Sequence, residues 1–183
     1  MGGIDKGLAE LCGRPMVEYA IEALRGQAGT LLISANRNIP HYARYGLLVV
    51  RDQLPDFAGP LAGIASLMAA TPAAWLLIAP CDSPRLPTGL GPRLWRAVST
   101  AGADIGVAHD GARMEPTFAL LRCRLRPALE AALAKGERKV ARWYASQRTV
   151  CVDFSDCPQA FLNINSPSQR DGFATQAGGP HPA

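Results

Sequence analysis

The sequence predicts a single α/β domain in which helices cover a mostly parallel sheet. Its 183 residues are 48% hydrophobic and 19% charged, which is enough to build one sizeable core. Short apolar runs alternate with longer segments of helical periodicity, and this order is typical of strands joined by crossover helices. We expect the domain to cover residues 1–173, followed by a disordered tail at 174–183, where Gly, Pro, His and Ala dominate.

The N-terminal half contains two helical patterns and three strand patterns. Pro15 suits the first turn of a helix, whose apolar residues recur at helical spacing: Val17, Ala20, Ile21 and Leu24. Residues 31–34 and 46–50 predict strands, and Pro60 leads a second helix. Residues 75–79 form a continuous apolar run, which predicts a strand buried on both faces.

The same alternation of strand and helix continues through the C-terminal half. It covers five further segments: residues 90–98, 104–108, 117–121, 125–134 and 149–152. Between the second and third of these, His109-Asp110-Gly111 predicts a surface turn rather than an acid–base pair, because Asp-Gly is a strong turn signal.

Composition and charge exclude several classes of protein. A net charge of +4 favours anionic partners, but the basic residues are dispersed, which fits phosphorylated small molecules better than nucleic acid. No uncharged apolar run reaches the roughly 18 residues of a membrane span, and no secretory signal is present, so we expect a cytoplasmic protein. The five cysteines, which lack a C-x-x-C pair, are expected to be reduced thiols.

The N-terminal residues 1–9, M-G-G-I-D-K-G-L-A, resemble half of a phosphate-binding loop. Gly2 and Gly3 would let backbone N–H groups approach an anion, and Lys6 would add a compact positive charge. Glycine pairs beside lysine are also common in plain turns, which is the competing interpretation.

Polar residues follow three of the predicted strands. The segment Ala35-Asn36-Arg37 follows the first, Asp52 follows the second, and Asp82 follows the third. Ligands of open α/β sheets bind beyond the carboxyl ends of the strands, so these side chains are candidate ligand contacts. Asp52 is expected to accept hydrogen bonds from a nucleobase or sugar, or else to cap the turn at 53–57.

Asp82 is the strongest candidate for a metal ligand. It lies between Pro80 and Pro84 in a short, stiff loop, which would hold a carboxylate in place for a hard cation such as Mg²⁺. The competing interpretation is an Asx-turn or a cap of the helix expected over 87–98.

Two further motifs are candidate ligand contacts. Gly59, Pro60 and Gly63 stand at a predicted helix start, where free N–H groups favour an anion or a closely approaching ligand. Asn163 and Asn165 alternate, so in an extended segment both amides would point to one face and could bind a heterocycle. The competing interpretation of the glycines is an ordinary turn at the start of a helix. For the amides it is the cap of a helix that begins near residue 168.

In series, the motifs M-G-G-I-D-K-G-L, S-A-N-R, R-D with G-P-L-A-G, P-C-D-S-P and F-L-N-I-N-S-P resemble molybdenum cofactor guanylyltransferase over residues 1–173. The resemblance implies a Rossmann-like, three-layer nucleotidyltransferase fold. It also implies an enzyme that uses Mg²⁺ to join GMP from GTP to the phosphate of molybdenum-molybdopterin and releases pyrophosphate. Such a reaction needs positioning and charge neutralisation, because the attacking group is already a phosphate.

The resemblance also implies roles for individual residues. Lys6 and Asp82 would be catalytic, with Asp82 as the Mg²⁺ ligand. The nucleotide side would contain Gly2, Gly3, Lys6, Ser34, Asn36, Asp52 and Asp82. The pterin side would contain Gly59, Pro60, Gly63, Asn163 and Asn165. The expected partners are these small molecules, with transient contacts to molybdoenzyme maturation proteins, and the expected state is a monomer without nucleic-acid or membrane binding.

The sequence departs from the family pattern at three places. The family begins with an apolar strand and L-A-G-G-x-x-x-R, so we expect an N-terminal strand to be missing and the start codon to be assigned too late. Ser34 stands where a relative can have asparagine, and Glu115 stands where His or Gln is common. Two alternatives therefore stay open: cytidylyl transfer to the same cofactor, and a non-catalytic protein that binds molybdopterin or a maturation partner.

Overall fold

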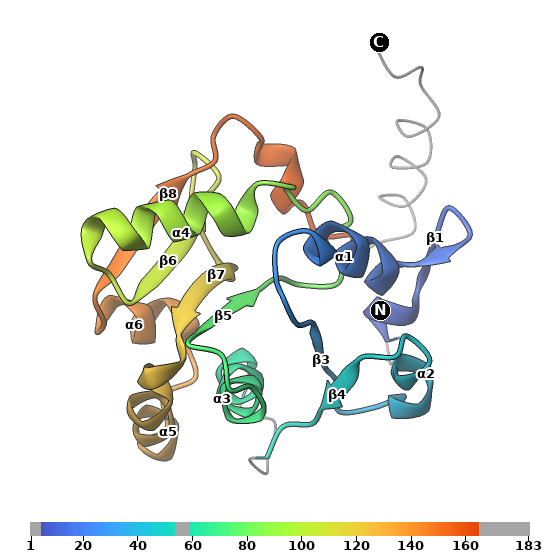
Figure 1. Ribbon diagram of the computed structural model, residues 1–183, viewed down its shortest axis with the longest axis horizontal. Helices are drawn as coiled ribbons and strands as arrows, with labels where there is room; N and C mark the ends of the chain where they lie inside the picture. The colour runs from blue at the N-terminus through green and yellow to red at the C-terminus, as the bar shows by residue number, and fades with distance from the viewer. Residues whose placement is uncertain (1–4, 54–58, 165–183) are drawn as a thin grey trace.

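The β-structure is divided among separate sheets rather than joined into one. The computed structural model describes residues 5–53 and 59–164, and its arrangement is shown in Figure 1. Strands β3 (Leu32–Ser34) and β4 (Leu48–Val50) form a parallel pair. A four-stranded sheet has the order β5-β7-β6-β8, and a short hairpin joins β1 (Glu10–Leu11) to β2 (Arg14–Pro15).

The four-stranded sheet is mixed: the predicted mostly parallel arrangement holds for the direction of three strands, but two of the three pairings are antiparallel. Strand β7 (Met114–Arg122) is antiparallel to both β5 (Trp75–Ile78) and β6 (Ile105–His109). Strand β8 (Thr149–Asp153) is parallel to β6, so only β7 runs in the opposite direction. The predicted turn at Asp110 is confirmed, because Asp110 Oδ1 accepts from the backbone N–H groups of Ala112 and Arg113 between β6 and β7.

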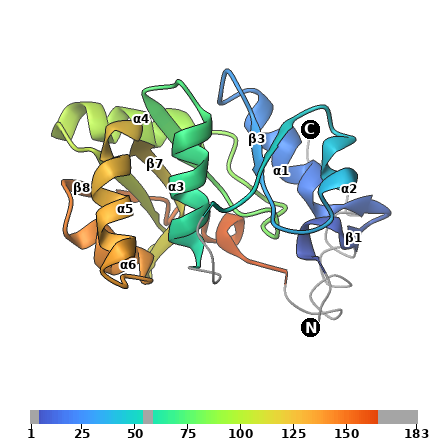
Figure 2. The same cartoon turned by 90° about the horizontal axis from the view of Figure 1, so that it is seen from below.

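Helices cover both faces of this sheet and give the three layers (Figure 2). Helices α3 (Pro60–Ala70), α5 (Arg126–Ala134) and α6 (Val140–Ala145) pack on one face. Helix α4 (Leu90–Ala101) and the 3₁₀ turn η3 (Pro158–Phe161) pack on the other. Alternate β7 residues serve the two cores, since successive side chains of a strand point to opposite faces.

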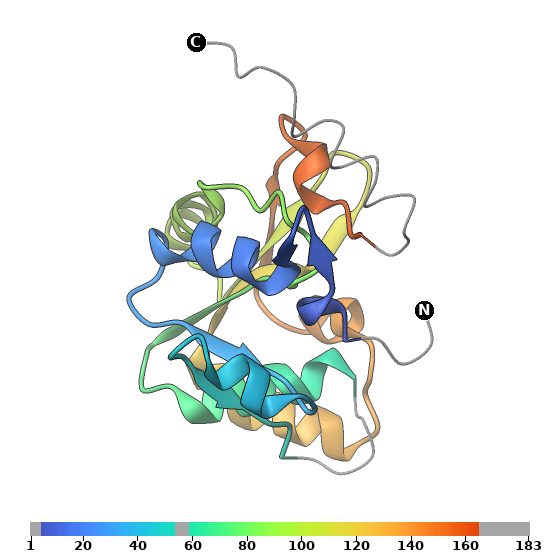
Figure 3. The ribbon, with the colours of Figure 1, turned by 90° about the vertical axis from the view of Figure 1, so that its right-hand side faces the viewer.

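The parallel pair has its own small core. Val17 and Ile21 of α1 (Met16–Arg25) pack against Ile33 of β3 and Tyr42 of α2 (Ile39–Ala43). The apolar stripe that predicted α1 therefore faces this core, with Ala20 reaching the α4 side of the larger sheet. In Figure 3, the N-terminal hairpin β1-β2 lies beside α1.

The prediction that residues 75–79 are buried on both faces is wrong. Only Leu76 is buried in β5, whereas Leu77 and Ile78 are partly exposed. The reason is that β5 pairs with β7 on one edge, and no strand in residues 5–53 or 59–164 pairs with its other edge. Strand β3 likewise pairs only with β4 there.

Several predicted features lie outside the described residues. They are Gly2, Gly3, most of the turn at 53–57, Asn165 and the tail at 174–183. Across the ranges that are described, no helix has the length and apolar character needed to cross a membrane.

Candidate active site

Lys6 and Asp82 meet although they are far apart in the sequence. Lys6 begins the 3₁₀ turn η1 (Lys6–Leu8), and Asp82 lies in the loop after β5. Lys6 Nζ lies 3.2 Å from Asp82 Oδ2, and the two side chains are 44% and 11% exposed. A half-exposed ammonium can bind an anion and a nearly buried carboxylate can bind a cation, so the two together suit a metal-bound phosphate.

The loop that carries Asp82 is fixed by the C-terminal segment. The backbone N–H of Ile164 donates to Asp82 O at 2.8 Å, and Ser83 Oγ donates to Asn163 Oδ1 at 2.6 Å. Helix α4 begins at Leu90 with Gly89 as its N-cap, so Asp82 does not cap that helix. The helix-cap interpretation of Asp82 is therefore wrong, and Asn163 is placed beside the Asp82 loop.

A cavity of about 390 Å³ lies between β3 and β5 under helix α3. Six of the predicted site residues line it: Ser34, Asn36, Asp52, Gly59, Pro60 and Gly63. Pro80 lines it as well, two residues before Asp82. The structure thus brings the polar strand ends and the glycines of α3 together around one cavity. Asp82 of the Lys6–Asp82 pair lies in the loop after β5 whose Pro80 lines this cavity.

Asn36 and Asp52 form a reciprocal pair in the wall of this cavity. Asn36 Nδ2 donates to Asp52 Oδ2 at 2.8 Å, and the Asp52 backbone N–H donates to Asn36 Oδ1 at 2.9 Å. The other carboxylate oxygen, Asp52 Oδ1, is shielded from solvent and accepts no hydrogen bond from the described residues. Because a buried acceptor without a donor is unfavourable, this oxygen suits an N–H or O–H group of a ligand.

Glycines allow helix α3 to approach these polar groups. A Cβ at Gly63 would lie 3.1 Å from Ser34 Oγ and 3.4 Å from Asp52 Oδ1, so a larger residue would crowd both. Gly59 has a φ of 72°, a conformation that favours glycine, and as N-cap it brings no capping side chain to α3. Pro60 has no N–H and the Ala62 N–H donates to the Gly59 carbonyl at 3.1 Å, so what the glycines of α3 offer a ligand is chiefly room for close approach.

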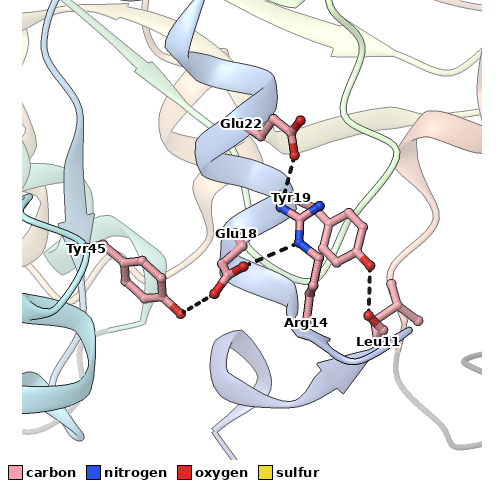
Figure 4. A network of polar contacts seen from close by, with 6 residues as sticks. All are labelled: Leu11, Arg14, Glu18, Tyr19, Glu22 and Tyr45. Carbon is pink, nitrogen blue, oxygen red and sulfur yellow. Dashed lines mark hydrogen bonds and ion pairs between the residues drawn. The ribbon is translucent and has the colours of Figure 1, made fainter.

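The hairpin that follows η1 is held to helix α1 by polar contacts (Figure 4). Arg14 donates to Glu18 Oε2 at 3.3 Å, and the Tyr19 hydroxyl donates to the Leu11 carbonyl at 2.7 Å. The Tyr45 hydroxyl donates to Glu18 Oε1 at 3.2 Å and so connects α1 to the segment before β4. Two of these contacts hold the hairpin to α1, and the third holds α1 to the segment before β4.

Sequence reasoning missed some residues around the site. Ile78 and Thr117 line the cavity from β5 and β7, and Asp5, Asn38 and Tyr42 surround the loop that carries Lys6. Asp5 and Tyr42 are separated by 37 positions, so no local pattern could have connected them. For Ile78, the apolar run at residues 75–79 indicates a strand but not a cavity-lining position.

Cys81 is expected to resist alkylation in the folded protein. Burial, with the negative charges of Asp82 and Asp5, raises the pKa of its thiol to about 11. All five cysteines are free, as predicted, and Cys12 and Cys151 are exposed. Since the thiolate is the reactive form, we expect Cys81 to react with iodoacetamide at pH 8 about 100-fold more slowly than Cys12. Peptide mass spectrometry would measure this; equal rates in the native protein, with a denatured sample as control, would contradict it.

The chain is similar to several known proteins. The model of the MobA-like NTP transferase domain matches residues 1–150. The molybdenum cofactor guanylyltransferase of Shewanella putrefaciens (strain CN-32 / ATCC BAA-453) is 44% identical over 174 residues, covering 95% of this chain and 89% of the relative. The protein of the same name from Shewanella pealeana (strain ATCC 700345 / ANG-SQ1) is 46% identical, covering 93% and 85%.

Solved structures show the same fold at lower identity. Molybdopterin-guanine dinucleotide biosynthesis protein A from Archaeoglobus fulgidus has a TM-score of 0.78 at 20% identity, covering 95% of this chain and 92% of that one. The 2-C-methyl-D-erythritol 4-phosphate cytidylyltransferase from Thermus thermophilus has a TM-score of 0.72 at 19% identity, covering 94% and 93%. The predicted nucleotidyltransferase fold is confirmed.

Proposed function

The chain belongs to the MobA-like NTP transferase family, and we propose on this basis that it transfers GMP from GTP to molybdenum-molybdopterin. The products are the guanine dinucleotide form of the cofactor and pyrophosphate. The named guanylyltransferases that match almost the whole chain support this reaction. The structural observation that carries it is the 3.2 Å contact of Lys6 with Asp82, in the loop whose Pro80 lines the cavity.

In this proposal Lys6 binds the GTP phosphates and Asp82 binds Mg²⁺. The described residues contain no group of three or more His, Cys, Asp or Glu side chains that could hold a metal ion. A single nearly buried carboxylate nevertheless fits Mg²⁺, which is commonly bound by one or two carboxylates with substrate phosphates and water. When bound, the ion would neutralise charge on the reacting phosphates.

The positive charge of Lys6 serves the same purpose from the protein. Its ammonium can leave Asp82 and contact a phosphate oxygen without a large movement, because it is 44% exposed. Since the attacking group is a phosphate of molybdopterin, no side chain needs to act as a nucleophile. The residues Lys6 and Asp82 act by orienting the triphosphate and by stabilising negative charge.

The cavity provides the contacts to the nucleoside and the pterin. Asp52 Oδ1 would accept from an N–H of the base or a sugar hydroxyl, with Ser34 and Asn36 beside it. Gly59, Pro60 and Gly63 would lie against the pterin substrate, and Asn163 would contribute its Nδ2 group because its Oδ1 accepts from Ser83. The monomeric state, the cytoplasmic location and transient contacts with maturation proteins are parts of the same proposal.

The test is a transfer assay with the purified chain, Mg²⁺, molybdenum-molybdopterin and either GTP or CTP. We expect release of pyrophosphate and formation of the guanine dinucleotide, with GTP used at least about tenfold better than CTP as measured by kcat/KM. Mass spectrometry of the product identifies the transferred nucleotide. Preference for CTP would indicate the cytidylyl reaction, and binding of molybdopterin without turnover of either nucleotide would indicate a binding protein.

A further inference from the structure

The carboxylate of Asp5 connects the Lys6 loop to helix α2. Asp5 Oδ1 accepts from the Tyr42 hydroxyl at 2.6 Å and from the Gly7 backbone N–H at 3.2 Å. Asp5 Oδ2 accepts from Asn38 Nδ2 at 3.0 Å. Both oxygens of the residue next to Lys6 are therefore occupied by donors, two of which belong to α2 or its N-cap.

Tyr42 is a rigid anchor for this connection. Only 4% of the residue is exposed, and its ring packs with Val17, Ile21 and Ile33 in the core of the parallel pair. Burial, and then the hydrogen bond to Asp5, raises the pKa of the Tyr42 phenol, so the hydroxyl stays protonated and donates at any pH used for an assay. A Cβ at Gly7 would collide with that hydroxyl, so the loop packs directly on it.

The two members of the catalytic pair belong to different parts of the fold. Asp5 and Lys6 are attached through α2 to the β3-β4 pair, whereas Asp82 follows β5 of the four-stranded sheet. A lysine side chain has four flexible methylene groups, so the backbone position of Lys6 is what the protein can fix. The hydrogen bonds of Asp5 fix that position on the α2 side.

We propose that Tyr42, acting through Asp5, is a positioning residue that holds Lys6 opposite Asp82 for binding of the GTP triphosphate. The inference rests on the proposed function, because it requires Lys6 to contact the nucleotide. Asn38 supports Asp5 in the same role from the N-cap of α2. Its φ of 55° is unusual for a residue other than glycine, and Asn is among the side chains that tolerate it.

The test is Tyr42→Phe in the full-length chain, which removes the hydroxyl and keeps the buried ring. We expect the KM for GTP to rise about tenfold, with a smaller change in kcat, because a lost hydrogen bond to a carboxylate lets the loop shift. The matched control is Tyr45→Phe, whose hydroxyl donates to Glu18 of helix α1 rather than to Asp5; its GTP kinetics should match those of the unmodified chain.

Lys6→Met separates a positioning role from a structural one. If Tyr42 acts through Lys6, adding Tyr42→Phe to Lys6→Met should raise the KM for GTP no further, whereas a general loss of structure would lower activity in both backgrounds. Asn38→Gly removes the other α2-side donor to Asp5, and glycine tolerates the left-handed conformation at this position. This variant should also raise the KM for GTP, and it replaces Tyr42→Phe in the test if Tyr42→Phe folds poorly. Wild-type kinetics in Tyr42→Phe, or an equal effect in both backgrounds, would overturn the inference. No effect of Lys6→Met itself would instead overturn the proposed role of Lys6, and the inference with it.

Discussion

Asp82→Asn is expected to lower the kcat/KM for GMP transfer by at least about 100-fold while the protein stays folded. The amide keeps the size of the side chain, and the loop is still held by the Ile164 N–H bond to the Asp82 carbonyl. The substitution removes the charge that pairs with Lys6 and that would bind Mg²⁺. Steady-state assays over a range of GTP and Mg²⁺ concentrations would measure the loss.

The control for Asp82→Asn is Asp156→Asn, which removes an exposed carboxylate paired with Arg93. It should leave the transfer rate within about twofold, since exposed ion pairs contribute little. Lys6→Met should impair the same reaction, and the double variant should be much less impaired than the product of the two single effects, because both residues act on one triphosphate. Transfer by Asp82→Asn within about twofold of the unmodified chain would refute the catalytic role of Asp82.

Much of the candidate site could be predicted because the fold determines where strands end. The places of Asn36 and Asp52 after strands predict a shared edge, and the structure joins them through a reciprocal pair. The place of Asp82 in a loop between two prolines predicts a fixed carboxylate, and its contact with Lys6 agrees with what the resemblance implies. Strand ends give a local signal, and parallel strands place such residues at one edge.

Other features could not be predicted because they depend on contacts that have no local pattern. Helix α2 has five residues, too few for a helical periodicity, and its Tyr42 contacts Asp5 across 37 positions. The partial exposure of β5 depends on which strand edges are paired, and an apolar run gives no information about pairing. The reversed direction of β7, by contrast, agrees with the turn that the sequence predicts at Asp110, because a tight turn joins antiparallel strands.

Asp104→Asn is expected to cause a large loss of stability for a polar substitution, about 2 kcal/mol at pH 7. Asp104 is buried just before β6, where its carboxylate accepts from Arg148 at 2.8 Å and from Arg124 at 2.6 Å. Arg122 lies 3.6 Å away. The substitution leaves three arginines around a neutral amide, although their exposure to water reduces the cost. Urea unfolding would measure the change, and Asp156→Asn should alter stability by less than about 0.5 kcal/mol.

The stability that Asp104 contributes should also depend on pH, and the direction of its pKa shift gives the sign of that dependence. Desolvation alone would raise the pKa of Asp104, but the hydrogen bonds from Arg148 and Arg124 outweigh it and lower the pKa below its ordinary value of 3.8. A carboxyl whose pKa is lower in the folded state stabilises the fold above the unfolded pKa and loses this contribution as pH falls through the folded pKa. The stability difference between the unmodified chain and Asp104→Asn should therefore be constant from about pH 7 to about pH 5 and shrink below about pH 4. A difference that stays constant down to about pH 3, or that grows with acid, would show that the charge of Asp104 is not what holds the starts of β6 and β8 to the end of β7.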